Sequence, residues 1–451
     1  MRDRKTVSKY FLFILLFGII GTYFYFWSFL DSEYVPYYGD EFYFFKNSES
    51  FFIHNTLKAS FTYTGHGARL LGADAHGPAY PLLYGLISKF FGWHNLNILI
   101  INFGLFLSTL VILIFSGKSG NIQIQQVLLT IGSPITLFYS VTFMPELIHL
   151  GIGILLFVFC KNYLATSSKS DFLILLCFII LAGCIRTTWF FALFGLIILP
   201  GPQTNFQKLF FALSGALLPI LFQHFLHEQV PNPFSEISRL VIENKFGEAA
   251  AILIFNAKRN IYFALTYTEG WFYTLQKIWM AGSLLLAIFL FRKNGLIQFG
   301  LLIICILISF NIILYKNYTW VDLRVYGPMI LFLNLGFFSY PNYKAASHIL
   351  LALNLISFIL ILPLQNTLIQ FRLQPDFIPI PSDLQTEIKN ISNPVLIQLD
   401  TLMLDNYSLD QLPVVNNQGE LIRYTLPYYQ MERVNPDYFI VKENDQLRVY
   451  P

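Results

Sequence analysis

The chain of 451 residues is poor in charge and in cysteine, and neither sign of charge dominates it. Charged residues make up 12% of the chain, about half the fraction typical of soluble domains. A net charge of +3, spread along the sequence, gives no reason to expect nucleic acid as a partner. The cysteines all lie in apolar runs, so neither a disulfide framework nor a zinc site is expected; they are Cys160, Cys177, Cys184 and Cys305.

Hydrophobic residues make up 55% of the chain and occur in long runs. Runs of about 20 apolar residues match the hydrocarbon thickness of a bilayer. The first run, Tyr10 to Leu30, follows a basic N-terminus that carries Arg2 and Arg4. It is too long for a signal peptide and no small-residue cleavage site follows it, so we interpret it as an uncleaved transmembrane helix.

We expect an all-α polytopic membrane protein with about eleven transmembrane helices. A further apolar run, Pro78 to Phe91, is too short to span and is expected to form a helix at the membrane surface. The expected spans are Tyr10 to Leu30, Asn95 to Ser116, Val127 to Phe143, Glu146 to Cys160, Phe172 to Cys184, Thr188 to Leu199, Leu209 to Leu226, Ile278 to Phe291, Leu296 to Tyr315, Pro328 to Phe338 and His348 to Leu364.

Basic residues in the short loops orient this arrangement. They all fall on the side of the N-terminus, which is therefore cytoplasmic, and an odd number of spans places the C-terminus outside. The long polar segments 31–93 and 227–277 are then outer loops of a transmembrane domain that covers residues 1–364. The basic residues are Lys118, Lys161, Lys169, Lys208, Arg292, Lys293 and Lys344.

Residues 365–451 are polar and differ in kind from the rest of the chain. Ser382 to Lys389 has the pattern of a short helix, with Ser382 and Gln385 spaced for a capping box. Val395 to Leu399, Tyr438 to Val441 and Leu447 to Tyr450 have the pattern of strands. We expect a small extracytoplasmic α/β domain.

The first outer loop contains an acidic pair, Asp40 and Glu41, among aromatic residues just past the first span. Partial burial near the membrane raises the proton affinity of a carboxylate, which suits a general base. A solvated acidic pair in a loop explains the same residues and is the commoner situation.

Three further charged residues stand at the outer ends of expected spans: Glu146, Arg186 and Arg324. A guanidinium at this depth can bind a phosphate through two parallel hydrogen bonds, or it can reach the lipid headgroups without further function. Ionisable residues at membrane depth usually face protein or a water-filled cavity. These residues can therefore line one cavity with Asp40, or form a structural ion pair.

The order of these features resembles the GT-C glycosyltransferases, in particular the branch with protein O-mannosyltransferases and bacterial aminoarabinose transferases. The resemblance lies in Asp40-Glu41 after one span, in a His-x-Pro-x-Tyr surface helix that begins at His76 and ends Lys-Phe-Phe-Gly, and in Asp322 to Pro328 around Arg324. The chain departs from the family pattern at Gly77, where the family often has proline, and in the C-terminal domain.

The resemblance implies a catalytic Asp40 with its neighbour Glu41, and a lipid donor whose phosphate meets Arg324 and Arg186. It implies a polyprenyl-phosphate sugar as donor, a glycan, lipid or protein as acceptor, and transfer with inversion. Some relatives use a divalent metal ion, for which Asp74, His76, Glu146, His54 and His66 offer ligand types without a diagnostic spacing. The residues expected to line the substrate cavity are Glu146, His76, Tyr326, Arg69, Lys258 and Arg259.

Other classes of membrane protein fit part of this pattern. A transporter or lipid flippase would carry polar groups near the bilayer midplane, commonly in two related halves. A polysaccharide polymerase or ligase would depend on paired arginines in outer loops, and a non-enzymatic scaffold is a further alternative. The composition favours a bacterial inner membrane. The sequence identifies neither the sugar nor the acceptor.

Overall fold

The structure is a computed structural model that describes residues 18, 20–28, 30, 34–36, 39–116, 120–200, 204–230, 233–266, 270–314, 323–338, 344–373, 377–392, 396–400, 403, 407–425, 436–443 and 446–450. Asp322, Lys118 and Val395 lie outside these residues. Of the first expected span, residues 20–27 are described as a helix.

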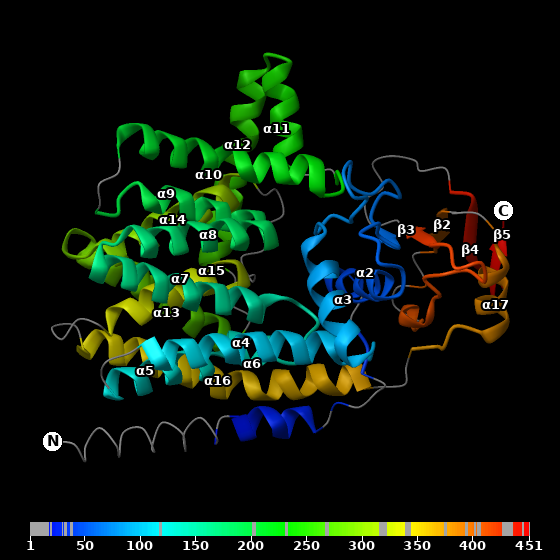
Figure 1. Cartoon of the computed structure of the whole chain (residues 1–451), viewed down its shortest axis with the longest axis horizontal. Helices are drawn as coiled ribbons and strands as arrows, with labels where there is room; N and C mark the ends of the chain where they lie inside the picture. Colours follow the sequence, from blue (N-terminus) through cyan, green and yellow to red (C-terminus); the bar gives the residue numbers. More distant parts are fainter. Residues whose placement is uncertain are drawn as a thin grey trace.

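The described chain is mostly helical, as expected. Figure 1 shows the long helices side by side, with α2, α3 and the strands gathered at one end of them. The longer helices are α2 (Asp40–His54), α3 (Ala79–Phe91), α4 (Asn97–Ser116), α5 (Gly120–Ile131), α7 (Glu146–Thr166), α8 (Lys169–Ile185), α10 (Asn205–Leu226), α11 (Pro233–Ile242), α12 (Phe246–Thr266), α13 (Gly270–Leu290), α14 (Gly295–Leu314), α15 (Leu323–Phe337), α16 (Lys344–Leu373) and α17 (Ser382–Asn390).

Five helices in the described part of the chain are long and apolar enough to cross a membrane. They lie in α4, α7, α10, α14 and α16, and shorter apolar helices accompany them. The membrane character expected from composition is therefore supported, whereas the number eleven stays a prediction. The surface helix is present as α3, which begins directly after Pro78 and ends before Gly92, a residue with φ of +84° that favours glycine.

Two of the expected spans are not single α-helices. Val127 to Phe143 is divided between α5 and the short helix α6 (Pro134–Tyr139). Pro134 has no N–H to donate back into α5, and it starts a new helix behind Ser133 instead. Thr188 to Leu199 lies across a 3₁₀ helix, η1 (Thr187–Phe191), and the short helix α9 (Ala192–Leu196).

The segment 227–277, expected as a polar loop, contains two helices. α11 and α12 pack against each other through Ile237, Leu240 and Ala249. The amide of Asn256 also donates to the carbonyl of Ile313 on α14 at 3.1 Å. The apolar residues that join α11 and α12 recur at helical spacing, so the sequence contained a signal for both helices despite its polar residues.

The expected C-terminal α/β region is a five-stranded sheet that takes one strand from segment 31–93. The strand order is β1-β3-β2-β4-β5, with only the β4–β5 pair antiparallel. The sheet comprises β1 (Phe61–Thr62), β2 (Leu396–Leu399), β3 (Arg423–Thr425), β4 (Tyr438–Glu443) and β5 (Gln446–Tyr450). The helix before the sheet, α17, has Pro381 at its N-cap position, and no side chain caps it. The expected capping box of Ser382 and Gln385 is not formed, and Gln385 instead donates to the carbonyl of Ile380.

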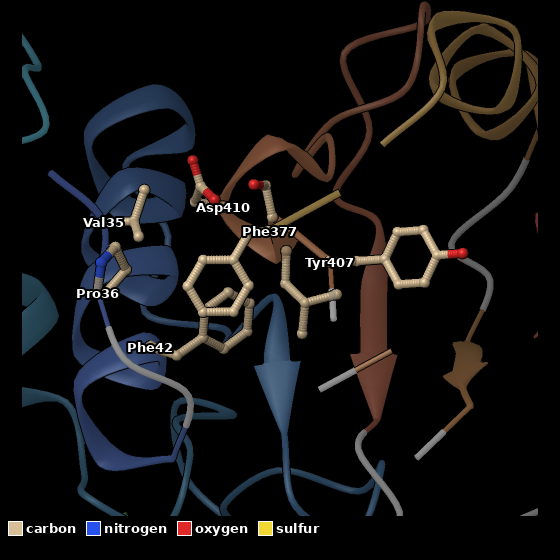
Figure 2. A pocket seen from close by; sticks show the side chains of 8 residues that line it. Val35, Pro36, Phe42, Phe377, Tyr407 and Asp410 are labelled. Carbon is tan, nitrogen blue, oxygen red and sulfur yellow. The ribbon is translucent and has the colours of Figure 1, made fainter. Parts of the chain in front are cut away.

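The first outer loop and the C-terminal region share one hydrophobic core, and α16 continues past the expected domain boundary at 364. The fully buried Lys46 of α2 donates to the carbonyl oxygens of Asp410 and Leu412 at 2.8 and 2.9 Å. Figure 2 shows the apolar junction, where Phe42 and Pro36 lie opposite Phe377. The C-terminal region therefore holds α2, whose first residue is Asp40.

Candidate functional site

Four charged residues that the sequence singled out stand at helix ends. Asp40 is the first residue of α2 and follows Gly39, whose φ of +87° turns the chain into the helix. Glu146 is the first residue of α7, and Arg186 lies between α8 and η1. Arg324 is the second residue of α15. Helix starts from distant parts of the sequence therefore meet at one end of the bundle.

These four side chains form one alternating chain of charges. Arg324 places Nη2 3.6 Å from Asp40 Oδ2 and Nε 3.9 Å from Glu146 Oε1. Arg186 Nη1 lies 3.6 Å from the same Glu146 oxygen. Glu146 is 3% exposed, whereas 41% of the Asp40 side chain is accessible. The buried carboxylate thus fixes both arginines, and Asp40 faces the accessible side.

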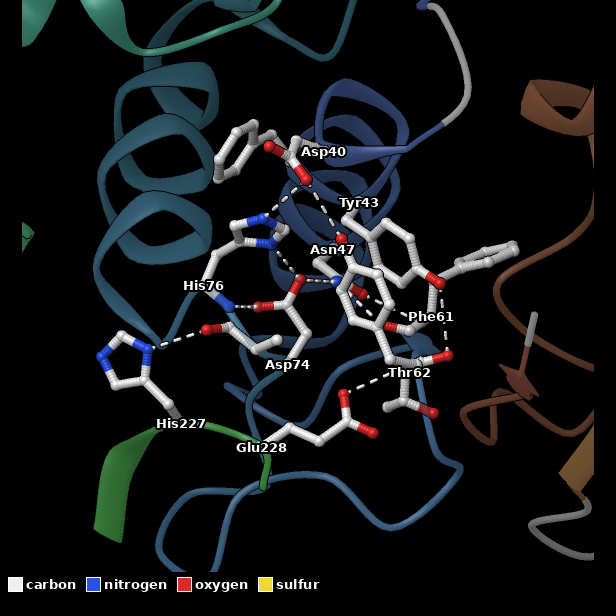
Figure 3. A network of polar contacts seen from close by, with 12 residues as sticks. Asp40, Tyr43, Asn47, Phe61, Thr62, Asp74, His76, His227 and Glu228 are labelled. Carbon is white, nitrogen blue, oxygen red and sulfur yellow. Dashed lines mark hydrogen bonds and ion pairs between the residues drawn. The ribbon is translucent and has the colours of Figure 1, made fainter. Parts of the chain in front are cut away.

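The other oxygen of Asp40 is held from the opposite direction. His76 Nε2 lies 3.3 Å from Asp40 Oδ1, and Tyr63 donates its hydroxyl hydrogen to the same oxygen at 3.2 Å. His76 Nδ1 lies 3.3 Å from Asp74 Oδ2, to which Asn47 donates at 2.8 Å. Figure 3 shows the His76 ring between the two carboxylates. Asp40 Oδ2 is therefore the oxygen directed towards Arg324.

The electrostatics of this arrangement keep Asp40 ionised. Burial alone would raise its pKa, but the hydrogen bond and charge of His76, the charge of Arg324 and the Tyr63 hydroxyl hold the pKa of Asp40 well below its usual range. For His76, burial would lower the pKa, and the carboxylates of Asp74 and Asp40 outweigh it and raise the pKa to about 10. At neutral pH the site therefore contains an ionised carboxylate beside an imidazolium, and the raised proton affinity expected for Asp40 from the sequence is wrong.

The segment that carries Asp74 and His76 is held by the start of the second outer loop. His227 Nδ1 lies 2.9 Å from the carbonyl oxygen of Ala75, and the backbone N–H of Glu228 donates to the carbonyl of Asp74 at 3.0 Å. Figure 3 shows both residues beneath the network. Gly77 has φ of +81°, and a Cβ there would lie 2.8 Å from the His227 ring. Proline cannot adopt this φ.

Glu41, expected beside Asp40 in catalysis, lies elsewhere. It accepts two hydrogen bonds from the guanidinium of Arg372 at 2.5 and 2.7 Å, and both side chains are buried. Consecutive residues of a helix point about 100° apart, so the two carboxylates of the pair cannot serve the same site. We therefore assign Glu41 a structural role that joins α2 to the end of α16.

The remaining expected cavity residues are scattered. Tyr326 is packed inside the bundle at 3% exposure. Arg69 Nη1 lies 2.6 Å from His224 Nε2 at the surface. Lys258 and Arg259 belong to α12, where the Arg259 guanidinium lies over the ring of Phe263. In contrast, His76 and Arg324 contact Asp40, and Glu146 joins Arg324 to Arg186.

The sequence offered several side chains as ligands for a divalent metal ion. Within the described residues, no group of three or more His, Cys, Asp or Glu side chains is arranged to hold a metal ion. Of the expected candidates, Asp74 and His76 contact each other, while Glu146 contacts the two arginines.

Sequence reasoning missed three polar partners of the site. Asn47 lies seven residues after Asp40 on α2, and this spacing returns it to the same helix face. His149 lies three residues after Glu146 and shares its face of α7. Both positions were therefore detectable by helical spacing. Tyr63 carries no comparable signal, because it follows a strand of only two residues.

Comparisons with protein-family models, with curated proteins and with solved structures find no match to this chain.

Proposed function

We propose that the protein is a membrane glycosyltransferase that moves a sugar from a polyprenyl-phosphate donor to an acceptor hydroxyl at the outer face of the membrane. The proposal rests on one observation above all: Arg324 contacts both Asp40, at 3.6 Å, and Glu146, at 3.9 Å. A base and a phosphate-binding cation side by side are the two groups that this reaction needs.

In the proposed reaction, Asp40 Oδ2 accepts the proton of the acceptor hydroxyl while that oxygen bonds to the anomeric carbon. The bond between this carbon and the phosphate oxygen breaks, and polyprenyl phosphate leaves with the electron pair. Base and leaving group lie on opposite faces of the sugar, so the configuration inverts. His76 does not take the proton, because a pKa of about 10 keeps it protonated at neutral pH.

Arg324 contacts Asp40 and also binds the donor phosphate in this proposal, and this double role accelerates the step. Asp40 loses its negative charge as it accepts the proton, while the leaving phosphate gains a second negative charge. The attraction between Arg324 and Asp40 therefore weakens, while the attraction between Arg324 and the leaving phosphate strengthens. An interaction that strengthens between ground state and transition state raises the rate of the chemical step.

We also propose the arrangement in the membrane. Eleven spans would place the N-terminus in the cytoplasm and the C-terminal sheet outside, in a bacterial inner membrane. The site lies at the end of the helical bundle that also carries α2, α3 and the sheet (Figure 1), which supports an outer location. A glycan, lipid or protein acceptor would then approach from outside, where 41% of the Asp40 side chain is accessible.

Deletion of the gene followed by mass spectrometry of lipid-linked sugars and of cell-envelope glycans tests the proposal. A polyprenyl-phosphate sugar should accumulate, and one glycan should lose that sugar. The wild-type chain supplied in trans should reverse both changes. Unchanged lipid-linked sugars together with unchanged glycans, in cells shown to express the protein before deletion, would reject a transferase of this kind.

A further inference from the structure

A second network of three buried side chains lies next to the charged cluster. Trp189 of η1 donates from Nε1 to His149 Nδ1 at 3.1 Å. His149 Nε2 lies 2.8 Å from the hydroxyl oxygen of Tyr80 on α3. The exposed fractions of Trp189, His149 and Tyr80 are 6%, 1% and 4%. Three separate elements thus meet in one hydrogen-bonded line.

The chemistry of these groups fixes every proton in the line. An indole N–H can only donate, so His149 Nδ1 must be the unprotonated acceptor. A neutral imidazole carries its one proton on the other nitrogen, and Nε2–H therefore donates to the oxygen of Tyr80. The hydroxyl hydrogen of Tyr80 then remains for another acceptor. Within the described part of the chain, Tyr80 has no second hydrogen-bond partner.

The other two residues of this line, His149 and Trp189, lie beside the proposed phosphate-binding groups. His149 and Trp189 line a small cavity together with Arg186 and Thr188. Glu146, which contacts both arginines, begins the same helix as His149. Burial, with Arg186 lowering and Glu146 raising it, leaves the pKa of Tyr80 well above its usual value, so the hydroxyl keeps its hydrogen at neutral pH.

We propose that Tyr80 donates a hydrogen bond to an anionic phosphate oxygen of the lipid donor beside Arg186, and that Trp189 and His149 are the positioning residues that direct this hydrogen. The inference rests on the proposed function. It adds a neutral donor to the two arginines, from a helix that the sequence identified only as architecture. A hydrogen bond to a charged oxygen is stronger than one between neutral groups.

Binding of C55 polyprenyl phosphate to the purified full-length protein in nanodiscs tests the proposal, with C55 polyprenol as the phosphate-free control. Tyr80→Phe removes only the hydroxyl and should weaken binding of the phosphate about 10-fold, while leaving polyprenol unaffected. Tyr84→Phe is the matched control. Tyr84 lies on the same helix and is equally buried, but its hydroxyl hydrogen is already donated to Asn102 Oδ1. It should leave phosphate binding unchanged.

The outcomes separate the two proposals. If the wild-type protein does not prefer polyprenyl phosphate to polyprenol, the proposed donor is wrong and the role of Tyr80 is wrong with it. If the wild-type protein prefers the phosphate and Arg324→Ala loses this preference, but Tyr80→Phe binds like wild type, only the role of Tyr80 is overturned.

The tautomer of His149 gives a readout that does not depend on the ligand. In ¹⁵N-histidine-labelled protein, the signal that disappears in His149→Gln should show a protonated Nε2 and an unprotonated Nδ1. Trp189→Phe removes the donor to Nδ1 and should introduce the other tautomer, with weaker phosphate binding. A protonated Nδ1 in the wild-type protein would contradict the proton assignment and hence the proposal.

Discussion

Arg324 Nη2 lies 3.6 Å from Asp40 Oδ2, which joins the start of α15 to the start of α2. Neither residue would be held in this position by its own helix alone. Glu146 fixes the arginine from α7, and Lys46 ties α2 to the carbonyls of Asp410 and Leu412 in the C-terminal region. The predictions below each remove one part of this arrangement.

Arg324→Ala should impair use of the lipid donor. Loss of a guanidinium that binds a phosphate is expected to raise the donor KM about 10-fold or more and also to lower kcat, because the contact strengthens in the transition state. Initial rates of transfer measured against donor concentration would show this. Arg259→Ala is the control, since Arg259 lies over Phe263 on α12. Equal donor dependence in the Arg324 variant and the wild type would rule out a phosphate contact.

His76→Gln should shift the acid limb of the pH–rate profile. In the wild type, the depressed pKa of Asp40 keeps the base ionised through the range from pH 5 to 8. Loss of the imidazolium removes the largest lowering influence while burial still raises the pKa, so the acid limb should move up by about one pH unit or more. As the pH is lowered below 5, the rate should begin to fall at a higher pH in the variant than in the wild type.

Tyr63→Phe removes a weaker partner of the same carboxylate and should shift the limb in the same direction by less. The depressed pKa of Asp40 also favours the folded state above its unfolded pKa, and this contribution is lost as the pH falls through the folded pKa. Identical acid limbs in wild type and His76→Gln would show that His76 does not set the ionisation of Asp40.

Glu41→Gln should destabilise the fold rather than disable the chemistry. It leaves the buried guanidinium of Arg372 without a charged partner, at a cost of about 3–5 kcal/mol. Thermal unfolding in detergent should show a lower Tm, with the activity per folded molecule retained at low temperature. Glu243→Gln removes exposed pairs with Arg239 and Lys245, which water screens, and should leave the Tm close to that of the wild type. A Tm unchanged by Glu41→Gln would contradict the structural role.

Gly77→Ala should reduce activity through its effect on the loop that holds His76. The new Cβ would lie 2.8 Å from the His227 ring, at a backbone φ of +81° that disfavours alanine. Gly92→Ala is the matched control, because Gly92 has a φ of +84° with nothing within 4 Å of its added Cβ. Rates measured at saturating donor should fall for the first variant and stay near wild type for the second. Equal rates would show that the contact with His227 is unimportant.

Glu146, Arg186 and Arg324 were expected at the ends of spans, and the structure places each of them at a helix end. Asp40 was expected in a loop, whereas it is the first residue of α2, directly after Gly39. The role of Glu41 did not follow from the sequence. Its partner Arg372 stands at the far end of the chain, and no local pattern connects them.

The fold was predictable in its helices and less so in its boundaries. Long apolar runs gave α4, α7, α10, α14 and α16. Segment 227–277 was interpreted as a loop from its polar residues, although it contains α11 and α12, which pack together through Ile237, Leu240 and Ala249. The two-residue strand β1 is too short to carry an alternation pattern, so its place in the C-terminal sheet depends on tertiary pairing with Tyr424 and Thr425.

Replacement of Asp40 by asparagine tests the central claim most directly. In a deletion strain, the glycan product restored by the wild-type chain would be quantified by mass spectrometry for Asp40→Asn and for Glu41→Gln at equal membrane expression. Loss of a general base should lower the product rate about 100-fold or more in Asp40→Asn, while Glu41→Gln retains transfer in its folded fraction. Wild-type levels of product from Asp40→Asn would contradict the assignment of Asp40 as the base.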